Sequence, residues 1–515
     1  MRAYITFLVA GLAIIGLFAV TWFSPNNIGT SFPSEFGFLN VVLFLLTTYI
    51  VWHEIIASAH IALLLPKMKK WRVIKPQKDL KVAFITTFVP GKEPLSMLRQ
   101  SLKSITAAHY NHDTWLLDEG NDPEAKKICA EFGVKHFSRH GIKKYNTDGG
   151  KFAARTKGGN HNAWYDAYGH TYDIVAQVDL DFIVKPNFLT ETLGQFKDPK
   201  VAFVGTPQYY GNYNDGLVAR GAAEQSFSFY GPVERGLAGV DTPMMVGANH
   251  IVRVEALRQI GWYEAHLTED LLTGMTLYAN GWKGKYCPKI LAVGEGPNTW
   301  EAFFTQQMRW AHGCFDILFR HSFRLLKTMS FSRKIRFAIM LQHYFSGVNL
   351  FLGSLLLFLY FVFGISGASY PTILMFCIYL PILLWLFILP MWHHRFNINP
   401  KKEKGLLLAG RIVNLATQPI YFLAFIGALR NKKLHFIVTP KGKGASSTVS
   451  PRLFRHHIAL ALIAAAGLTY GIFTGKDSFI LVFWAIANIV TALIFVYISL
   501  RTRFILKPKN ITKAV

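Results

Sequence analysis

Two pairs of acidic residues in this 515-residue chain have types and spacing suited to chemistry on a diphosphate compound. Asp179 and Asp181 lie two residues apart after an apolar run, and carboxylates so placed can hold a divalent cation and, through it, a diphosphate. Glu269 and Asp270 stand before the helical pattern at 271–279, where a carboxylate could serve as a general base. Taken alone, each pair also fits a simpler interpretation: a solvated strand end, or a favourable helix N-terminus.

A second group of motifs supplies cations and an aromatic face. Lys157 begins the run KGGN, which offers a positive charge and close backbone approach to a phosphate, although such a run alone also fits a turn. Gln306 and Arg309 are three residues apart and would share one face of a helix, with Trp310 beside them. The alternative for this second motif is an amphipathic helix that anchors at a membrane surface through Trp and Arg.

The elements that must position these residues lie in a segment of soluble composition from about 78 to 300. Alternating strands and helices predict an α/β domain with a mainly parallel sheet. The strands are expected at 82–88, 115–117 and 172–178, with a helix at about 94–107. Asp118 and Asp179 follow two of these strands, at the edge where open α/β sheets bind ligands.

The composition of the whole chain indicates a membrane protein. Hydrophobic residues make up 51 % of it, and the mean hydropathy is +0.25, which excludes a disordered or fibrous chain and is too apolar for an ordinary soluble enzyme. The 55 Lys and Arg residues outnumber the 30 Asp and Glu residues, and they cluster beside apolar runs. This pattern favours cytosolic loops over nucleic-acid binding, so no nucleic-acid partner is expected. The four cysteines are scattered without a CxxC pair, which argues against a disulfide scaffold or a thiolate metal site.

Six apolar stretches are long enough to cross a bilayer of ordinary thickness. They are expected at 4–23, 38–65, 343–364, 372–392, 457–475 and 479–500. The basic loops then place both termini and the large segment 66–340 in the cytosol. A seventh stretch, 405–429, has basic residues at both ends and contains Arg411 and Pro419, so we expect it to lie in the membrane interface rather than to cross.

In order, the motifs resemble the processive family-2 glycosyltransferases, the D, DxD, TED, QxxRW group that includes cellulose, curdlan, chitin and hyaluronan synthases. The segment 206–208, TPQ, is similar to their T-P-Q/H segment, and FIVTPK at 436–441 is similar to the gating loop of cellulose synthases. The resemblance covers about 78 to 445 together with the span layout. It implies a GT-A-type α/β domain with a Rossmann-like mixed sheet, inserted in an α-helical transmembrane domain of about six spans plus interface helices.

The domain organisation that the resemblance implies has four parts. These are an N-terminal transmembrane hairpin at 1–77, a cytosolic glycosyltransferase domain at 78–300, interface helices with the QxxRW motif at 301–335, and a C-terminal transmembrane channel region at 336–515 with the gating loop at 436–441. About 15 residues follow the last predicted span, so no C-terminal PilZ domain and no direct control by cyclic di-GMP are expected.

The resemblance also implies roles for individual residues. Asp270 would be the base, Glu269 would belong to the catalytic group, and Asp181 with Asp179 would bind Mg²⁺ or Mn²⁺ on the diphosphate. Substrate contacts would come from Thr87, Asp118, Lys157, Asp179, Gln306, Arg309, Trp310, Phe436, Thr439 and Lys441.

The function expected from this resemblance is inverting polymerisation of a cellulose-like β-glucan from UDP-glucose, with extrusion through the protein's own channel in the plasma membrane. Two alternatives stay open: a chitin- or hyaluronan-like synthase using UDP-N-acetylglucosamine or UDP-glucuronate, and a transporter or channel with an inactive transferase domain. Expected partners are the UDP-sugar, the growing polysaccharide and the lipid bilayer, and accessory export subunits are a further partner class.

Three segments depart from the family pattern. The first acidic motif is Asp118-Glu119-Gly120 rather than D-D-G. The opening segment TTFVPGKEP replaces the compact P-T-Y-N-E-P of cellulose synthases. The run GAN at 247–249 stands where the family has a Gly-Ser-like acceptor turn, which leaves the identity of the acceptor open.

Overall fold

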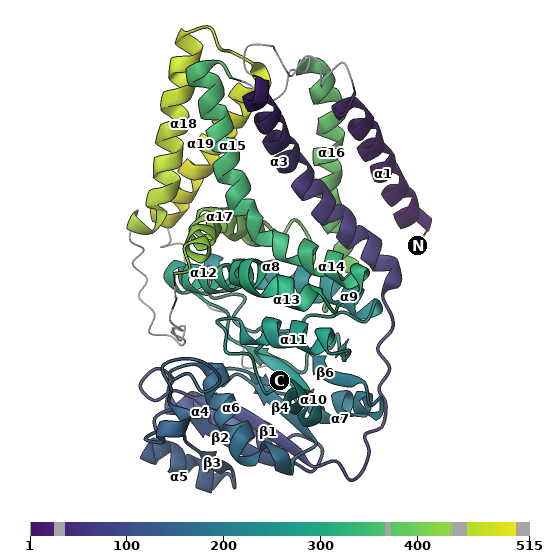
Figure 1. Ribbon diagram of the computed structural model, residues 1–515, viewed down its shortest axis with the longest axis vertical. Helices are drawn as coiled ribbons and strands as arrows, with labels where there is room; N and C mark the ends of the chain where they lie inside the picture. The colour runs from purple at the N-terminus through teal and green to yellow at the C-terminus, as the bar shows by residue number, and fades with distance from the viewer. Residues whose placement is uncertain (1, 25–36, 366–371, 433, 435–450, 501–515) are drawn as a thin grey trace.

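The computed structural model describes residues 2–24, 37–365, 372–432, 434 and 451–500. Its elements form three layers (Figure 1). The sheet and its flanking helices lie at one end, a set of long helices lies at the other end, and helices that run crosswise lie between them.

A seven-stranded mixed sheet forms the centre of the α/β domain, as expected for the α/β class. Its order is β3-β2-β1-β4-β8-β6-β9, and β8 is antiparallel to both of its neighbours. The strands are β1 (Val82–Phe88), β2 (Asp113–Asp118), β3 (Lys135–Phe137), β4 (Ile174–Val178), β6 (Val201–Gly205), β8 (Asn249–Arg253) and β9 (Lys283–Tyr286). A small second sheet has the order β5-β10-β7, formed by Ile183–Val184, Ala292–Gly294 and Tyr209–Tyr210.

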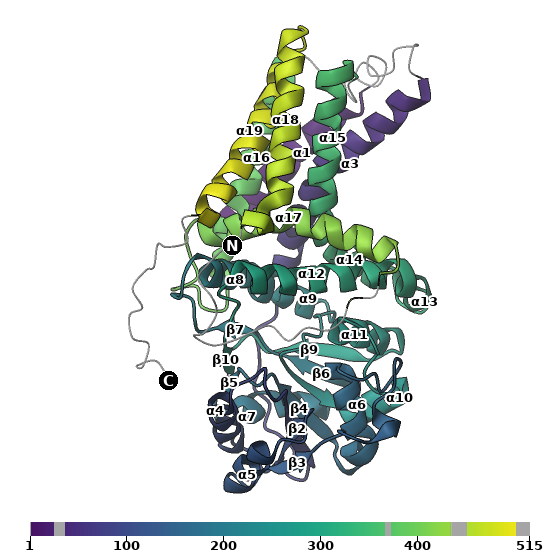
Figure 2. The same cartoon turned by 90° about the vertical axis from the view of Figure 1, so that its left-hand side faces the viewer.

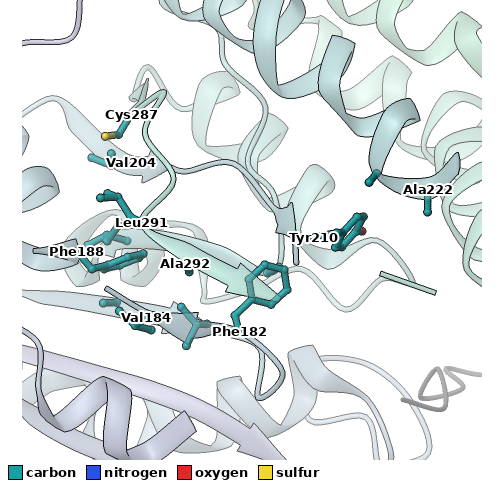
Figure 3. Close-up of a cluster of buried hydrophobic side chains, with 14 of the residues drawn as sticks. Phe182, Val184, Phe188, Val204, Tyr210, Ala222, Cys287, Leu291 and Ala292 are labelled. Carbon is teal, nitrogen blue, oxygen red and sulfur yellow. The ribbon is translucent and has the colours of Figure 1, made fainter. Parts of the chain in front are cut away.

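Helices cover the sheet because its central strands, such as β1, β4 and β6, are apolar and buried on both faces. These helices are α4 (Leu95–Thr106), α5 (Pro123–Glu131), α6 (Lys157–Tyr168), α7 (Phe188–Thr192), α10 (Val254–Ile260) and α11 (Glu269–Ala279). The helices α8 (Leu217–Ser228) and α9 (Glu234–Gly239) lie in the crosswise layer (Figure 2). One core contains Phe84, Phe188 and the cluster of Figure 3, in which Val184 and Leu291 also lie. A second core contains Trp164.

The predicted strands and helix are found close to their expected bounds. The apolar run at 82–88 is β1, and six of its seven residues are buried. The segment 115–117 lies inside β2, and 172–178 contains β4. The expected helix at about 94–107 is α4.

The middle layer contains α12 (Trp300–Asp316), the π-helical turn η6 (Ile317–His321), α13 (Ser322–Leu326), α14 (Phe331–Leu341) and α17 (Leu408–Leu429). Figure 2 shows α17 lying across the ends of the long helices, above α12. These two helices pack through small and aromatic residues, including Ala311, Phe315, Tyr421 and Ala424. α17 also packs against α8. The two helices are so close that a Cβ added at Gly221 of α8 would lie 2.4 Å from the side chain of Val413 of α17.

The long helices are α1 (Arg2–Trp22), α3 (Gly37–Leu64), α15 (Ser346–Phe363), α16 (Thr372–His393), α18 (Arg455–Phe473) and α19 (Phe479–Leu500). By length and composition, five stretches of the described residues could cross a membrane: Ile5–Trp22, Val41–Lys67, Phe331–Phe363, Leu408–Leu429 and Arg452–Phe473. Because one of these stretches is α17, hydropathy alone does not distinguish a crossing helix from one lying flat. The number of six spans stays a prediction.

Candidate active site

Three parallel strands bring predicted site residues to one edge of the sheet. Thr87 is the penultimate residue of β1, Asp118 ends β2, and Asp179 follows β4. The strand pairing places Phe88 opposite Asp118, and β4 pairs with β1 on its other side. The carboxyl ends of these strands therefore form the floor of the candidate site, as strand direction predicts.

Asp118 is fully buried and holds its own loop in place. Its carboxylate accepts hydrogen bonds from the backbone N–H of Gly120 at 2.9 Å, from that of Asp122 at 2.6 Å, and from Nε2 of His136 at 3.0 Å. These three donors make Asp118 a positioning residue in this structure. Its contact with a nucleotide stays a prediction.

The departure from D-D-G has a structural role that sequence reasoning missed. Glu119 accepts two hydrogen bonds, at 2.7 and 3.0 Å, from the fully buried guanidinium of Arg139. The same guanidinium donates to the carbonyls of Tyr145, Ala153 and Thr156 at 3.0 to 3.2 Å. Arg139 thus shapes the loop that leads into α6. The feature of the sequence that could have indicated this role is Glu119, whose side chain is longer than that of the Asp usual at the second acidic position.

Lys157 lies at the first position of α6 and points into the centre of the site. Thr156 caps this helix, since its hydroxyl accepts the N–H of Gly159 at 3.1 Å. The ammonium of Lys157 donates to Oδ1 of Asp179 at 2.5 Å and to the carbonyl of Gly247 at 2.8 Å. Burial alone would lower the pKa of Lys157, but the charge of Asp179 raises it above its ordinary value, so this side chain stays a cation.

Glu269 and Asp270 begin α11 and lie against two glycines. A Cβ at Gly247 would lie 2.8 Å from Oδ2 of Asp270, and a Cβ at Gly158 would lie 3.5 Å from Cβ of Glu269. The structure therefore brings Asp270 next to the backbone that also holds Lys157. The GAN run in the sequence pointed to Gly247, but only the structure shows that this glycine lies against Asp270.

The electrostatics of this centre make Glu269 a weaker acid than usual. Burial raises the pKa of the Glu269 carboxyl to about 7, and the adjacent charge of Asp270 adds to the rise. The cations Lys157 and Arg309 oppose the shift. Two adjacent carboxyl groups facing two cations are a common arrangement of functional sites, because proton affinity is tuned there by burial and by neighbouring charges.

The QxxRW helix α12 lies over this centre. Gln306 and Arg309 both lie near the buried Tyr210, and the charge of Arg309 also acts on Glu269. Gln306, Arg309 and Trp310 are all partly exposed. The helix is held in place by Gln307, whose amide oxygen accepts the Tyr421 hydroxyl of α17 at 2.7 Å.

Asp179 and Asp181 form the turn that follows β4. The N–H of Phe182 donates to the carbonyl of Asp179 at 3.0 Å, and Oδ2 of the buried Asp181 accepts the N–H of Glu295 at 3.3 Å. Both residues present carboxylate oxygens, the donors that Mg²⁺ and Mn²⁺ prefer, and such cations are bound through one or two carboxylates plus substrate phosphates. The residues therefore fit the cation that the resemblance implies. One oxygen of Asp179, Oδ1, also accepts a hydrogen bond from Lys157. Phe436, Thr439 and Lys441 lie outside the described residues.

Comparison with known proteins agrees with this geometry. Residues 174–389 match the family model described as glycosyl transferase family group 2. The chain contains a family-2 glycosyltransferase domain. The resemblance to cellulose synthase-like members of family 2 is thereby confirmed, as is the GT-A-like fold with its mixed sheet.

Three relatives of the glycosyltransferase domain show the range of the family. A UDP-forming cellulose synthase catalytic subunit of Dictyostelium discoideum is 34 % identical over 151 residues, 28 % of this chain and 14 % of that protein. The UDP-forming cellulose synthase catalytic subunit of Pseudomonas fluorescens is 24 % identical over 410 residues, 75 % and 51 % of the two chains. "Probable glucomannan 4-beta-mannosyltransferase 2" of Oryza sativa subsp. japonica is 27 % identical over 239 residues, 45 % and 40 %. The chain thus spans about half or less of the length of these relatives.

Proposed function

We propose that this protein is a processive, inverting glycosyltransferase that builds a β-glucan from UDP-glucose at the cytosolic face of the plasma membrane. The proposal rests on one observation above all. Lys157 contacts both Asp179 and the backbone of Gly247, and Asp270 lies against the same glycine. A cation for a diphosphate and a base for an acceptor are therefore a few ångströms apart, beneath α12.

The chain's own residues account for a single displacement. Asp270 takes the proton of the acceptor hydroxyl as that oxygen forms a bond to the anomeric carbon. The bond from this carbon to the diphosphate breaks in the same step, and UDP leaves with its electron pair. Because only one displacement occurs, the configuration at the anomeric carbon is inverted.

The leaving diphosphate is stabilised by preorganised charge. Lys157 and Arg309 both act on the acidic centre, and the forked guanidinium of Arg309 suits two phosphate oxygens. Asp181 and Asp179 would hold Mg²⁺ or Mn²⁺, which supplies further charge neutralisation when bound. A proton on Glu269 removes one of two adjacent negative charges beside the acceptor.

The acceptor and nucleotide contacts come from the walls of the site. Trp310 would present its ring to the acceptor sugar, with Gln306 beside it on α12. Thr87 and Asp118 lie at the strand ends where the nucleotide would bind. Phe436, Thr439 and Lys441 would close over the diphosphate and exclude water from it.

The arrangement of the helices supports transfer across a membrane. The catalytic domain lies at one end of the molecule and the long helices at the other, and α1 begins on the side that faces the catalytic domain (Figure 1). α17 lies crosswise between them (Figure 2), which fits a helix in the membrane interface. We therefore propose cytosolic termini, a cytosolic catalytic domain and a channel lined by the long helices, with accessory export subunits as further partners.

A second candidate substrate is an activated mannose, because one relative is named as a glucomannan 4-beta-mannosyltransferase. Chitin-like and hyaluronan-like synthesis stay alternatives within the same reaction class. A channel with an inactive transferase domain is disfavoured, since Asp270, Lys157 and Arg309 are all present and gathered at one site.

The test is an assay of the purified chain in lipid nanodiscs with UDP-glucose, UDP-N-acetylglucosamine, UDP-glucuronate and GDP-mannose. We expect nucleotide release and a β-linked polymer from UDP-glucose, confirmed by linkage analysis. Asp270→Asn should abolish release while still binding UDP, and Asp215→Asn, at an exposed aspartate, should leave it unchanged. Release by Asp270→Asn at the wild-type rate would remove Asp270 from the mechanism, and a polymer from another sugar would overturn the glucan assignment.

A further inference from the structure

A second group of metal-type ligands lies away from the Asp179–Asp181 turn. Among the residues that the structure describes, His266, Asp316 and His321 form one group whose ligand atoms all lie within 4.8 Å of one another. His266 belongs to the loop before α11, whereas Asp316 and His321 belong to the end of α12 and to η6. The group therefore joins the loop that leads into Glu269 and Asp270 to the helix that carries the QxxRW motif.

The two imidazoles converge on one carboxylate oxygen. Nε2 of His266 lies 3.0 Å from Oδ2 of Asp316, and Nε2 of His321 lies 3.7 Å from the same atom. The two rings meet edge to face with centroids 5.4 Å apart. Two nitrogens and one oxygen are a usual donor set for a late first-row cation such as Zn²⁺.

The π-helical turn is what brings His321 into this group. In an α-helix, residues five apart point about 140° away from each other, so His321 would not face Asp316. η6 covers 317–321 and closes with i→i+5 geometry, which returns His321 to the face of Asp316. Turns of this kind inside α-helices occur frequently at functional sites.

Neighbouring groups hold the ligands before any ion binds. Oδ1 of Asp316 accepts from Arg320 at 2.5 Å, and Arg320 also donates to the carbonyl of Ala428 at 2.6 Å. This leaves Oδ2 directed at the two imidazoles. Such outer hydrogen bonds orient the ligands in protein metal sites.

His266 can present a lone pair from Nε2. Its Nδ1 lies 3.0 Å from the hydroxyl oxygen of Thr268 and 3.1 Å from the Thr268 N–H. With its proton on Nε2, the ring accepts the N–H and donates to Asp316. With its proton on Nδ1, the ring donates to the hydroxyl and no longer accepts the Thr268 N–H. Nε2 is then open to a cation, whose binding selects this second form.

We propose that His266, Asp316 and His321 bind Zn²⁺ or a closely similar cation, and that this ion clamps the loop before α11 onto α12. The contact is already close, because a Cβ at Gly313 of α12 would lie 2.6 Å from Thr268. The clamp would hold Asp270 at a constant position relative to Arg309. This consequence for catalysis rests on the proposed function, whereas the binding of the ion does not.

The experiment measures metal binding to the full chain in nanodiscs after removal of metals with a chelator. To silence the diphosphate-site cation, the titration is done in an Asp181→Asn background with Zn²⁺, and with Co²⁺ as a spectroscopic probe. We expect one equivalent of Zn²⁺ per chain, a visible Co²⁺ absorption with mixed nitrogen and oxygen ligation, and a higher unfolding temperature with Zn²⁺. His321→Ala should weaken binding at least tenfold and abolish the thermal shift.

The matched control is His170→Ala, which removes an exposed histidine elsewhere and should bind as the parent does. His266→Gln is the second variant, so a folding failure of His321→Ala leaves the test intact. The proposal is overturned if the parent binds no stoichiometric Zn²⁺, or if both histidine variants bind it as tightly as the parent. Asp270→Asn should lose transfer but keep this ion, which separates failure of the clamp from failure of the proposed function.

Discussion

Replacing Arg139 with Met tests whether the Glu119 departure positions the nucleotide end of the site. The methionine keeps much of the length of the side chain but removes all of its donors. In the structure, Arg139 is fully buried and donates two hydrogen bonds to Glu119 and four to backbone carbonyls, the longest of them at 3.5 Å to Phe152. One of these carbonyls is that of Thr156, the N-cap of α6.

The expected loss of stability follows from the Glu119 carboxylate, which the substitution leaves without its partner. Removing one partner of a buried ion pair costs about 3 to 5 kcal/mol, but Glu119 keeps 21 % of its side chain exposed and can be partly hydrated, which favours the lower end. We therefore expect a loss of about 3 kcal/mol in the unfolding free energy of the catalytic domain. For a domain of this size, this corresponds to roughly 6 to 12 °C in its unfolding temperature.

The assay is thermal unfolding of the chain in nanodiscs, followed by titration with UDP. Arg139→Met should lower the unfolding temperature and weaken UDP binding, because the loop before Lys157 loses its anchor. Arg99→Met is the control, since Arg99 pairs with Glu131 at the surface with both side chains about half exposed. An unfolding temperature equal to that of the control would refute the anchoring role. A lower unfolding temperature with unchanged UDP affinity would show that Arg139 stabilises the domain without positioning the nucleotide site.

Three further outcomes are expected. Because burial raises the pKa of Glu269 above its ordinary 4.5, the folded chain holds this proton more tightly than the unfolded chain, so stability falls as pH rises from about 4.5 through about 7. Glu269→Gln should flatten that fall in thermal scans between pH 5 and pH 8, whereas an unchanged slope would contradict the burial argument. Gly247→Ala should lower the rate of transfer more than tenfold, because its Cβ would collide with Asp270 while circular dichroism stays that of the parent. Chelation should abolish transfer and Mg²⁺ or Mn²⁺ should restore it, with Asp181→Ala insensitive to both; full activity in chelator would exclude the metal role of Asp181.

Much of the local structure is predictable because it depends on neighbours in the sequence. The uninterrupted apolar run of β1 and the amphipathic pattern of α4 need no distant partner to be recognised. The placement of Asp118 and Asp179 at strand ends follows from the same reasoning, since parallel strands align their carboxyl ends. The order of the motifs was enough to indicate the family.

The direction of a strand and the tilt of a helix are different, because they depend on packing partners. β8 is antiparallel to β4, although it is buried almost as completely as its neighbours β4 and β6. The α17 segment is apolar and long enough to cross a bilayer, and its crosswise position results from contacts with α8 and α12. Hydropathy indicates that a segment can be buried, but it does not indicate which other segment, or the lipid, it is buried against.

The sequence by itself determined which residue types are available for chemistry and which strand ends carry them. Only the tertiary structure decided which of these residues meet. Lys157 contacts Gly247 90 residues away, Arg139 contacts Glu119 20 residues before it, and His266 meets Asp316 50 residues later. Contacts of this kind arise when the sheet and the crosswise helices bring distant segments together. Their energy depends on burial and hydrogen-bond geometry in the folded chain, so no local pattern encodes them.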